Sequence, residues 1–357
     1  MRLALLGCSA LVLVLAQPAT ARTAPRDHPG NSNDDPRLLV TGLAGGSGST
    51  VGPDGALYVP EPISGTITRV DPRTGRTSTF ADGLPPRTSG LGVGGVMDVA
   101  FLGETAYALV TLVGPDVGGS SVVGLYRVDS THQSSVVADI GAWSIANPPV
   151  PPFFVPSGVQ YALQRWHDGF LVTDGHHNRV LDVSIDGTIR QLVAFGNVVP
   201  TGLDVRGPAE GRGRAGRILV AQAGPVPHDP ADGRIVSISP RSGASSQVAA
   251  GAPILTDVEV CGSDAGAGVY AISNGVYSGD PEGSPGVPDT GSLVRVNGHG
   301  GFDVVASPLD RPTSLELLGG KAYVVTYDGE IWVVPLADRC GPSSRATVTQ
   351  TGTRSGS

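Results

Sequence analysis

A strand-and-turn pattern that recurs along the chain constrains its fold more than any other feature of the sequence. The clearest copy spans residues 157–200, where four short apolar runs are separated by turn signals at Asp168-Gly169, Gly175–Asn178 and Asp186-Gly187. The runs are rich in Val, Leu, Phe and Thr, and each has the length of an ordinary strand. Asp-Gly between such runs favours a tight hairpin turn, because glycine accepts the positive φ that the turn needs. This copy therefore predicts a four-stranded antiparallel meander.

Further copies of this plan follow at steps of about 44 to 62 residues, a period that is typical of propeller blades when the repeat is built from strands. Their first strands are expected near residues 47, 95, 157, 201, 256 and 313. A lone four-stranded sheet cannot bury both of its faces, whereas sheets packed face to face in a ring cover one another. We therefore predict an all-β fold, a six-bladed β-propeller, over residues 37–340.

The C-terminal copy is short, because a polar tail follows its third strand. The missing strand is expected at the other end of the chain, where RLLVTGL (37–43) matches the fourth strands of other copies, STFADGL (78–84), SVVADIG (135–141), QLVAFGN (191–197) and DVVASPL (303–309). We predict that this N-terminal strand completes the C-terminal blade. Such pairing closes the ring non-covalently and removes an unpaired sheet edge.

The segments outside the ring predict a secreted protein. Residues 1–21 combine a basic second residue, an apolar run and a small-residue cleavage site, as in a secretory signal peptide. The apolar run is too short to span a bilayer permanently, so no membrane span is expected. Residues 22–36 are polar and Pro-rich and are expected to form a linker, and residues 341–357 are expected to be a disordered tail.

The charge of the chain argues against a nucleic-acid partner. Only 16% of the residues are charged and the net charge is −8, whereas nucleic acid requires a basic face. We expect a monomer, and a partner that is a small molecule, a glycan or another protein.

The connections between the predicted strands differ in length on the two faces of the ring. Turns joining first to second and third to fourth strands are mostly tight and lie on what we call the lower face. Connections on the opposite, upper face are long, at 84–94, 113–121, 141–156, 224–233 and 275–291. Insertions gathered on one face of a repeat ring usually mark the face that binds, although insertions also accumulate on surfaces without a function.

Two cysteines, Cys261 and Cys340, remain once the expected signal peptide is removed. A leftover pair in an oxidising compartment usually bonds, and the predicted topology places both on the lower face of adjacent blades. We predict a disulfide that stabilises the fold by roughly 4–5 kcal/mol in the loop-entropy model. The alternative is a pair of unbonded, buried thiols.

Polar residues recur at one position of the predicted first strands, the innermost strands of the ring. They are Asp98, Gln160, Asp204, Glu259 and Glu316. A ring of such side chains at the channel mouth suits Ca²⁺ or another divalent cation, which takes six to eight oxygen ligands. It equally suits ordered water, or hydrogen bonds to the backbone of neighbouring blades, which buried polar groups require.

Further candidate ligand-binding residues lie on the predicted upper loops. They are Glu61, His176, His177, Asn178 and His228. Histidines adjacent in sequence seldom point into one metal site, and Asn in such a loop often forms turn hydrogen bonds. The sequence contains no G-x-S-x-G, H-E-x-x-H or C-x-x-C pattern, and we assign no catalytic residue.

Several phrases are similar to those of known propellers. GPDGALYVPE, VTDGHHNRV and PTGLDV resemble NHL-type and gluconolactonase-like propellers. The combination of LLVTGL, GTITRVDPRTG, VMDVAF, PSGVQ and TSLELLGGKAYVVTYDGEIWVV over residues 37–340 resembles the ScyD/ScyE family, named for scytonemin-gene-cluster proteins. The resemblance implies a secreted binding or scaffold propeller and carries over no catalytic residues. The gluconolactonase-like relatives imply an alternative, a hydrolase or lyase with a channel-mouth metal held by acidic and Asn side chains. In this sequence Glu61 and Asp204 roughly match the acidic ligands, and no residue matches the Asn.

Overall fold

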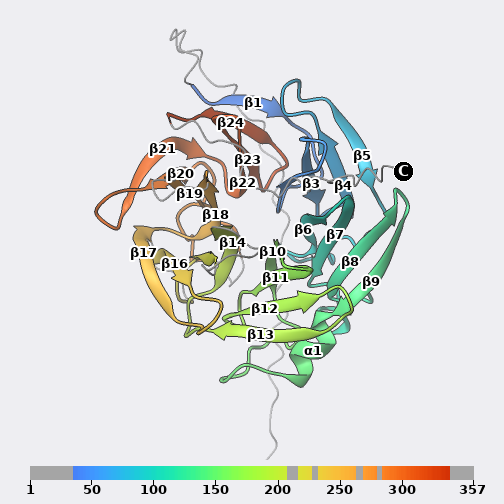
Figure 1. The fold of residues 1–357 in the computed structure, drawn as a ribbon. Coiled ribbons are helices and arrows are strands. Elements are labelled where there is room, and N and C mark those ends of the chain that lie inside the picture. Colours follow the sequence, from blue (N-terminus) through green and yellow to red (C-terminus); the bar gives the residue numbers. More distant parts are fainter. Residues whose placement is uncertain (1–34, 207–215, 227–231, 263–267, 280–283, 338–357) are drawn as a thin grey trace, which may run out of the picture. The chain divides into compact units, whose positions relative to one another are not determined.

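The computed structural model describes residues 35–206, 216–226, 232–262, 268–279 and 284–337. Strands in these residues form six four-stranded antiparallel sheets arranged in a ring (Figure 1). The all-β, six-bladed propeller predicted from the sequence repeat is therefore confirmed. Within each blade the chain meanders outward, so that the first strand lies at the centre of the ring and the fourth at the rim (Figure 1).

The first three blades follow one another directly along the chain. Blade 1 contains β2 (Thr50–Val51), β3 (Leu57–Glu61), β4 (Thr66–Val70) and β5 (Thr77–Ala81); blade 2 contains β6 (Gly95–Leu102), β7 (Thr105–Thr111), β8 (Gly124–Ser130) and β9 (Gln133–Asp139); blade 3 contains β10 (Gln160–Trp166), β11 (Gly169–Asp174), β12 (Arg179–Ser184) and β13 (Ile189–Ala194).

Blades 4 and 5 continue along the chain in the same way, whereas blade 6 combines strands from both ends of the ring-forming chain. Blade 4 contains β14 (Pro200–Arg206), β15 (Arg217–Gln222), β16 (Gly233–Ile238) and β17 (Ser245–Ala252); blade 5 contains β18 (Leu255–Cys261), β19 (Gly268–Ser273), β20 (Gly291–Val296) and β21 (Phe302–Leu309); blade 6 contains β22 (Pro312–Leu318), β23 (Lys321–Thr326), β24 (Ile331–Pro335) and β1 (Arg37–Val40).

The N-terminal strand completes the C-terminal blade, as predicted. β1 pairs antiparallel with β24, with Arg37 opposite Val333 and Leu38 opposite Trp332. Val40 is buried in a hydrophobic cluster that joins blade 6 to blade 1. The closing strand thus covers an otherwise open edge and also fills the joint between the last and the first blade.

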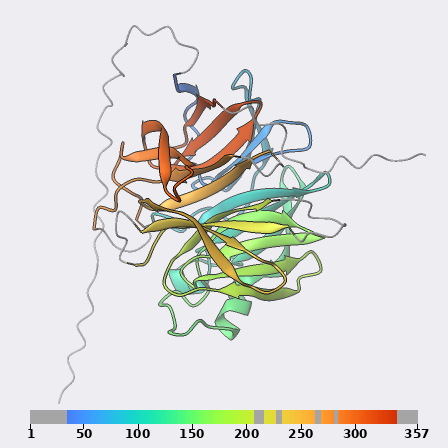
Figure 2. The ribbon, with the colours of Figure 1, turned by 60° about the vertical axis from the view of Figure 1, so that its left-hand side comes forward.

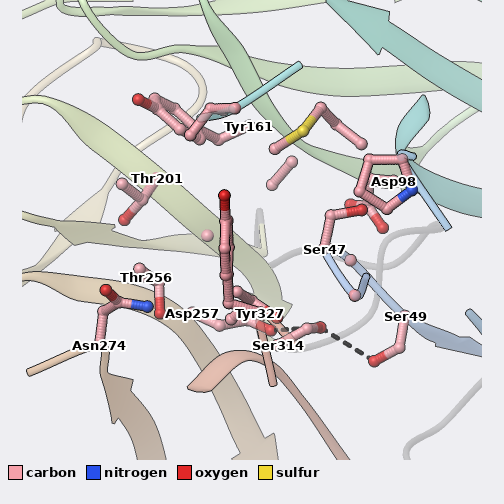
Figure 3. A pocket seen from close by; sticks show the side chains of 18 of the residues that line it. Ser47, Ser49, Asp98, Tyr161, Thr201, Thr256, Asp257, Asn274, Ser314 and Tyr327 are labelled. Atoms are coloured by element: carbon pink, nitrogen blue, oxygen red, sulfur yellow. Dashed lines mark hydrogen bonds between the residues drawn. The ribbon is translucent and has the colours of Figure 1, made fainter. Parts of the chain in front are cut away.

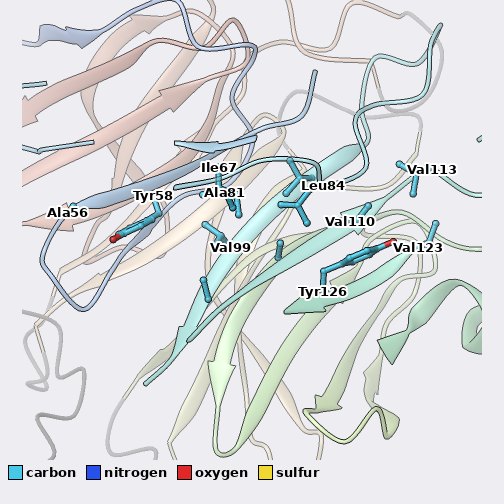
Figure 4. Packing of buried hydrophobic residues seen from close by; sticks show 13 residues of the cluster. Ala56, Tyr58, Ile67, Ala81, Leu84, Val99, Val110, Val113, Val123 and Tyr126 are labelled. Carbon is cyan, nitrogen blue, oxygen red and sulfur yellow. The ribbon is translucent and has the colours of Figure 1, made fainter. Parts of the chain in front are cut away.

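Hydrophobic layers fill the joints between neighbouring blades. Figure 4 shows the layer between blades 1 and 2, in which Ile67 and Leu84 lie with Val99 and Val110 in one buried cluster. Tyr58 adds an edge-on ring contact to this layer, with its centroid 4.8 Å from that of Phe101 in blade 2. Each fully buried aliphatic side chain of this kind stabilises the fold by about 1.5–3 kcal/mol. The face-to-face packing expected from the repeat is therefore the main source of stability.

The hairpin turn predicted at Asp168-Gly169 lies one residue earlier in the structure. Trp166 pairs with Gly169, so His167 and Asp168 form the turn, and His167 takes the positive φ of 53°. Gly169 instead begins β11, where an added Cβ would come within 2.4 Å of the carbonyl oxygen of Val183. Close approach of the neighbouring strand, rather than turn geometry, requires glycine at this position.

A short helix, α1 (Ile140–Ala146), occupies the start of the upper connection that the sequence predicts as a loop at 141–156. The Asp139 carboxylate caps it by accepting a hydrogen bond of 2.7 Å from the backbone N–H of Ala142. The helix buries its own residues Ile140 and Ser144 against the ring. The helix lies at the rim of the ring in both views (Figures 1 and 2), and a single 3₁₀ turn, η1 (Pro115–Val117), lies in the connection of blade 2.

Several predictions fall on residues outside the described ranges. These are the signal peptide, all but the last two residues of the linker, the C-terminal tail and Cys340, so the Cys261–Cys340 disulfide stays a prediction. Cys261 ends β18 and is buried in the layer between blades 5 and 6. No helix in the described part of the chain is long and apolar enough to cross a membrane.

The closing strand supplies a test of how the ring is held together. We expect Val40→Asp to lower the free energy of unfolding by at least about 2 kcal/mol, because it buries a charged group in the joint between blades 6 and 1. Leu38→Asp changes an exposed position two residues earlier in the same strand and should lower the free energy of unfolding by less than about 0.5 kcal/mol. Urea unfolding of both variants measures the difference, and equal losses would contradict a structural role for β1.

Candidate functional site

A cavity of about 150 Å³ lies at the centre of the ring and is lined by residues from all six blades. Its walls include the starts of β10, β14, β18 and β22 and the residues that follow β11, β15, β19 and β23. These are the ends of the strands that meet the upper connections. The cavity therefore occupies the upper end of the central channel, where the sequence predicts a binding face.

Shifts in strand register decide which side chains face this cavity. The pairing shifts between Val96 and Asp98 in β6 and between Leu255 and Asp257 in β18, as at a β-bulge. Asp98 and Asp257 both line the cavity as a result (Figure 3). Asp257 is not among the residues predicted from the sequence, which places Glu259 at the position of Asp98. The matching phrases VMDV (96–99) and LTDV (255–258) carry the signal that would have found it.

Three aspartates of the innermost strands bridge neighbouring blades. Each accepts one hydrogen bond from the N–H of the next residue and another from the N–H of an innermost strand in the following blade. The second bond joins Asp98 to Leu163 (2.7 Å), Asp204 to Val260 (3.0 Å) and Asp257 to Leu315 (2.8 Å). Asp204 makes its bridge two residues further down the strands than Asp257 does. Of the roles considered from the sequence for Asp98 and Asp204, the structure thus shows hydrogen bonding to the backbone of a neighbouring blade.

The five polar residues predicted to ring the channel do not form one layer. Asp98, Glu259 and Glu316 line the cavity, and Asp204 lies beside it, where it accepts a hydrogen bond of 2.8 Å from the lining residue Gln164. Gln160 is fully buried away from the lining. In the described part of the chain, no three His, Cys, Asp or Glu side chains come together in a way that would hold a metal ion.

Burial shifts the protonation of the two aspartates that face the cavity. It raises the pKa of Asp98 well above the usual range, and repulsion by Asp257 and Glu316 acts in the same direction. Burial likewise raises the pKa of Asp257 to about 7, with added repulsion from Asp204, although backbone hydrogen bonds oppose the shift. Both carboxyl groups therefore hold protons at a pH where an exposed aspartate is fully ionised.

Hydrogen bonds across the cavity wall join blades 5, 6 and 1. The Ser314 hydroxyl donates to Asp257 over 3.0 Å, and the hydroxyls of Ser314 and Ser49 lie 2.9 Å apart (Figure 3). The wall of the cavity is therefore part of the bonding that holds the ring together.

Aromatic side chains gather at the mouth of the cavity. Tyr327 and Tyr161 both line it (Figure 3). The Tyr327 hydroxyl donates to the carbonyl of Gly92 over 2.6 Å, and Arg87 donates to the same carbonyl over 2.8 Å. These bonds tie the connection between blades 1 and 2 to blade 6. The Tyr161 hydroxyl lies 3.1 Å from Nε2 of His176, which also lines the cavity.

The remaining upper-loop candidates lie away from the lining. The Glu61 carboxylate accepts hydrogen bonds from the Ala44 N–H (2.6 Å) and from the Thr68 hydroxyl. Asn178 accepts two bonds from the backbone N–H groups of residues 198 and 199, which fixes its turn. His228 lies outside the described residues. Only His176 of these candidates is thus seen to reach the cavity.

His177 belongs to a buried polar network in blade 3. Its Nδ1 lies 3.0 Å from the Asp174 carboxylate, which Arg179 also contacts through Nε at 2.8 Å. Gln160 donates to the other oxygen of Asp174 over 2.9 Å. The Arg179 guanidinium lies 4.8 Å from the ring centroid of Trp143 in α1. The network ties the connection between blades 2 and 3 to the ring, and its side chains form hydrogen bonds within the protein.

Comparison with known proteins shows similarity in fold alone. No protein-family model matches the chain, and no curated protein matches it. A gluconolactonase structure from Xanthomonas campestris is 13% identical with a TM-score of 0.57, over 84% of this chain and 89% of that one. A protein of unknown function from Bacteroides thetaiotaomicron is 9% identical with a TM-score of 0.52, over 85% and 72%. A streptogramin B lyase is 12% identical with a TM-score of 0.50, over 85% and 97%.

The raised pKa of Asp257 predicts how stability depends on pH. The folded state binds this proton more tightly than the unfolded chain, so the free energy of unfolding should fall as the pH rises from 3.8 towards about 7. The full contribution is on the order of a few kcal/mol. Asp257→Asn should flatten this fall in urea unfolding curves recorded between pH 4.5 and 7.5. Glu104→Gln, at an exposed turn, should leave the slope unchanged. An unaltered slope in Asp257→Asn would refute the assignment.

Proposed function

We propose that this protein is a secreted propeller that binds a small molecule in its central cavity without transforming it. The observation that carries the proposal is the cavity itself, where polar and aromatic side chains from all six blades converge. Binding sites in proteins are typically concave, with apolar walls and a few placed polar groups. The N-terminal signal pattern and the resemblance to ScyD/ScyE propellers support secretion and a binding role.

The size of the cavity limits the ligand. A volume of about 150 Å³ accommodates a molecule of about the size of benzene. The lining combines apolar side chains such as Met97, Leu163 and Leu203 with hydroxyl and carboxyl groups. A compact ligand with an apolar body and one polar group fits this composition better than a glycan or a protein segment.

The hydrogen bonds of two carboxylates support our choice of binding over metal-dependent hydrolysis. A gluconolactonase-like mechanism would use Glu61 and Asp204 as acidic metal ligands. Glu61 instead bonds to the backbone of Ala44 and to Thr68, and Asp204 bridges blades 4 and 5. Among the described residues, no three His, Cys, Asp or Glu side chains come together as they would around a metal ion. Both carboxylates therefore serve the assembly of the ring.

A thermal-shift screen with a cavity-blocking variant tests this function. A library of small amines, alcohols, lactones and carboxylates should contain compounds that stabilise the wild type, by about 2.7 kcal/mol at a hundredfold excess over Kd. Ala162→Phe fills the cavity from its wall and should abolish the shift. Ala194→Phe, on the exposed outer strand of the same blade, should retain it.

Absence of turnover is the second part of the proposal. We expect no hydrolysis of glucono-δ-lactone, with or without added Ca²⁺, Mg²⁺ or Zn²⁺. Metal-dependent hydrolysis that is lost in Ala162→Phe and kept in Ala194→Phe would overturn the non-catalytic function.

A further inference from the structure

We infer that the connection between blades 2 and 3 docks the protein on the surface of an uncharged lipid bilayer. The docking element is residues 142–156, which lie between β9 and β10 and include most of α1, and which we call the apolar loop. The inference goes beyond the proposed ligand binding and does not depend on it. It follows from the exposed surface of the loop, from the way the ring holds it, and from its composition.

The exposed surface of the apolar loop is almost entirely nonpolar. Ten of its residues are exposed, and Asn147 alone among these ten has a polar side chain. The other nine are Ala142, Ile145, Ala146, Pro148, Val150, Pro151, Pro152, Phe154 and Pro156. Val150 is 97% exposed and Phe154 is 73% exposed. Apolar side chains that gather in this way on a protein surface mark an interaction site.

The ring holds both ends of this exposed stretch in place. The carbonyl oxygen of Asn147 accepts a hydrogen bond of 2.7 Å from Nη1 of Arg179. At the other end, Nε2 of His177 lies 3.2 Å from the carbonyl oxygen of Val155. The buried polar network of blade 3 therefore fixes the loop on either side of its exposed apolar side chains. The loop is presented in one arrangement, which lowers the entropy lost when it binds a surface.

The backbone of the apolar loop is suited to a nonpolar environment. Five of its residues are prolines, namely Pro148, Pro149, Pro151, Pro152 and Pro156. Proline has no backbone N–H, so fewer donors lose their hydrogen bonds to water when the loop enters lipid. An exposed loop of ordinary composition would lose more, because each donor without a partner is costly in hydrocarbon.

Shape and charge favour a lipid surface over a protein partner. A side chain as exposed as that of Val150 stands clear of its neighbours. Fluid lipid can surround such a side chain, whereas a protein must offer a hollow of matching shape. Protein interfaces also carry a polar rim, and the sequence contains no Asp, Glu, Lys, Arg or His from Ile140 to Gln164.

The same lack of charge selects the kind of lipid. Anionic headgroups attract proteins through Lys and Arg side chains near the surface, and the apolar loop has neither. The net charge of −8 also repels an anionic membrane. The surface that fits the loop is therefore that of a zwitterionic lipid such as phosphatidylcholine.

Sedimentation with lipid vesicles tests the inference. The protein is purified after export, so that the expected signal peptide has been removed, and is mixed with vesicles of phosphatidylcholine. We expect saturable binding that changes less than about twofold between about 0.05 and 0.5 M NaCl, because salt screens only charged contacts. Adding phosphatidylglycerol should not strengthen it. Absence of binding to phosphatidylcholine, or binding that requires the anionic lipid, would overturn the inference.

Matched variants locate the contact on the apolar loop. The double variant Val150→Asp/Phe154→Asp should weaken vesicle binding at least about tenfold, because a charged side chain enters lipid only at high cost. Val304→Asp introduces the same charge at a valine of β21 that is 66% exposed and should bind as the wild type does. Thermal unfolding checks that both variants fold. Vesicle binding of the folded double variant that equals that of the wild type would refute the assignment.

A direct measurement of insertion distinguishes lipid from a second copy of the chain. In Phe154→Trp, brominated phosphatidylcholine should quench tryptophan fluorescence beyond the quenching seen in the wild type, and Val304→Trp should show no such increase. Sedimentation velocity without lipid should give a monomer. The inference is wrong if Phe154→Trp shows no added quenching. It is equally wrong if the wild type forms a dimer that Val150→Asp/Phe154→Asp dissociates, because the loop then contacts another copy.

Discussion

Mutual burial of sheet faces is the constraint on which this structure depends. No blade can cover both of its faces alone, so each needs a neighbour on either side, and the first and last blades need each other. β1 meets this need by pairing with β24 and by placing Val40 in the joint between blades 6 and 1. Stability is therefore a property of the closed ring, since a gap at any joint would expose two hydrophobic layers at once.

The centre of the ring obeys a second constraint, because the innermost strands bring polar groups together where little water reaches them. The carboxylates of Asp98, Asp204 and Asp257 obtain the hydrogen bonds that burial requires, because each accepts one from a backbone N–H of the next blade. The same side chains, or their neighbours, then form the wall of the cavity. Residues that assemble the ring and residues that would contact a ligand are thus partly the same. Burial at the centre of the ring raises the pKa values of Asp98 and Asp257, although the backbone hydrogen bonds that they accept oppose the shift.

The candidate site could be predicted only in outline. That polar side chains of the first strands face a central channel follows from the propeller pattern, and Asp98, Glu259 and Glu316 do line the cavity. Gln160 does not share the position of these residues, because it bonds to Asp174 inside blade 3. The prediction also misses Asp257. Gln160 comes before the register shift in β10, whereas Asp98 and Asp257 follow the shifts in β6 and β18, and side chains after such a shift exchange faces.

The sequence by itself determined the number of blades, their four-stranded plan and the pairing of the N-terminal strand with the C-terminal blade. Apolar runs and regularly spaced turns are properties of local sequence. Only the tertiary structure decided which polar groups remain to meet a ligand. The sequence singles out Glu61, His177 and Asn178 alike as candidate ligand-binding residues, yet each is used in hydrogen bonds within the protein. His176, beside them, reaches the cavity. The partners that decide this come from distant parts of the chain, so no local pattern records them.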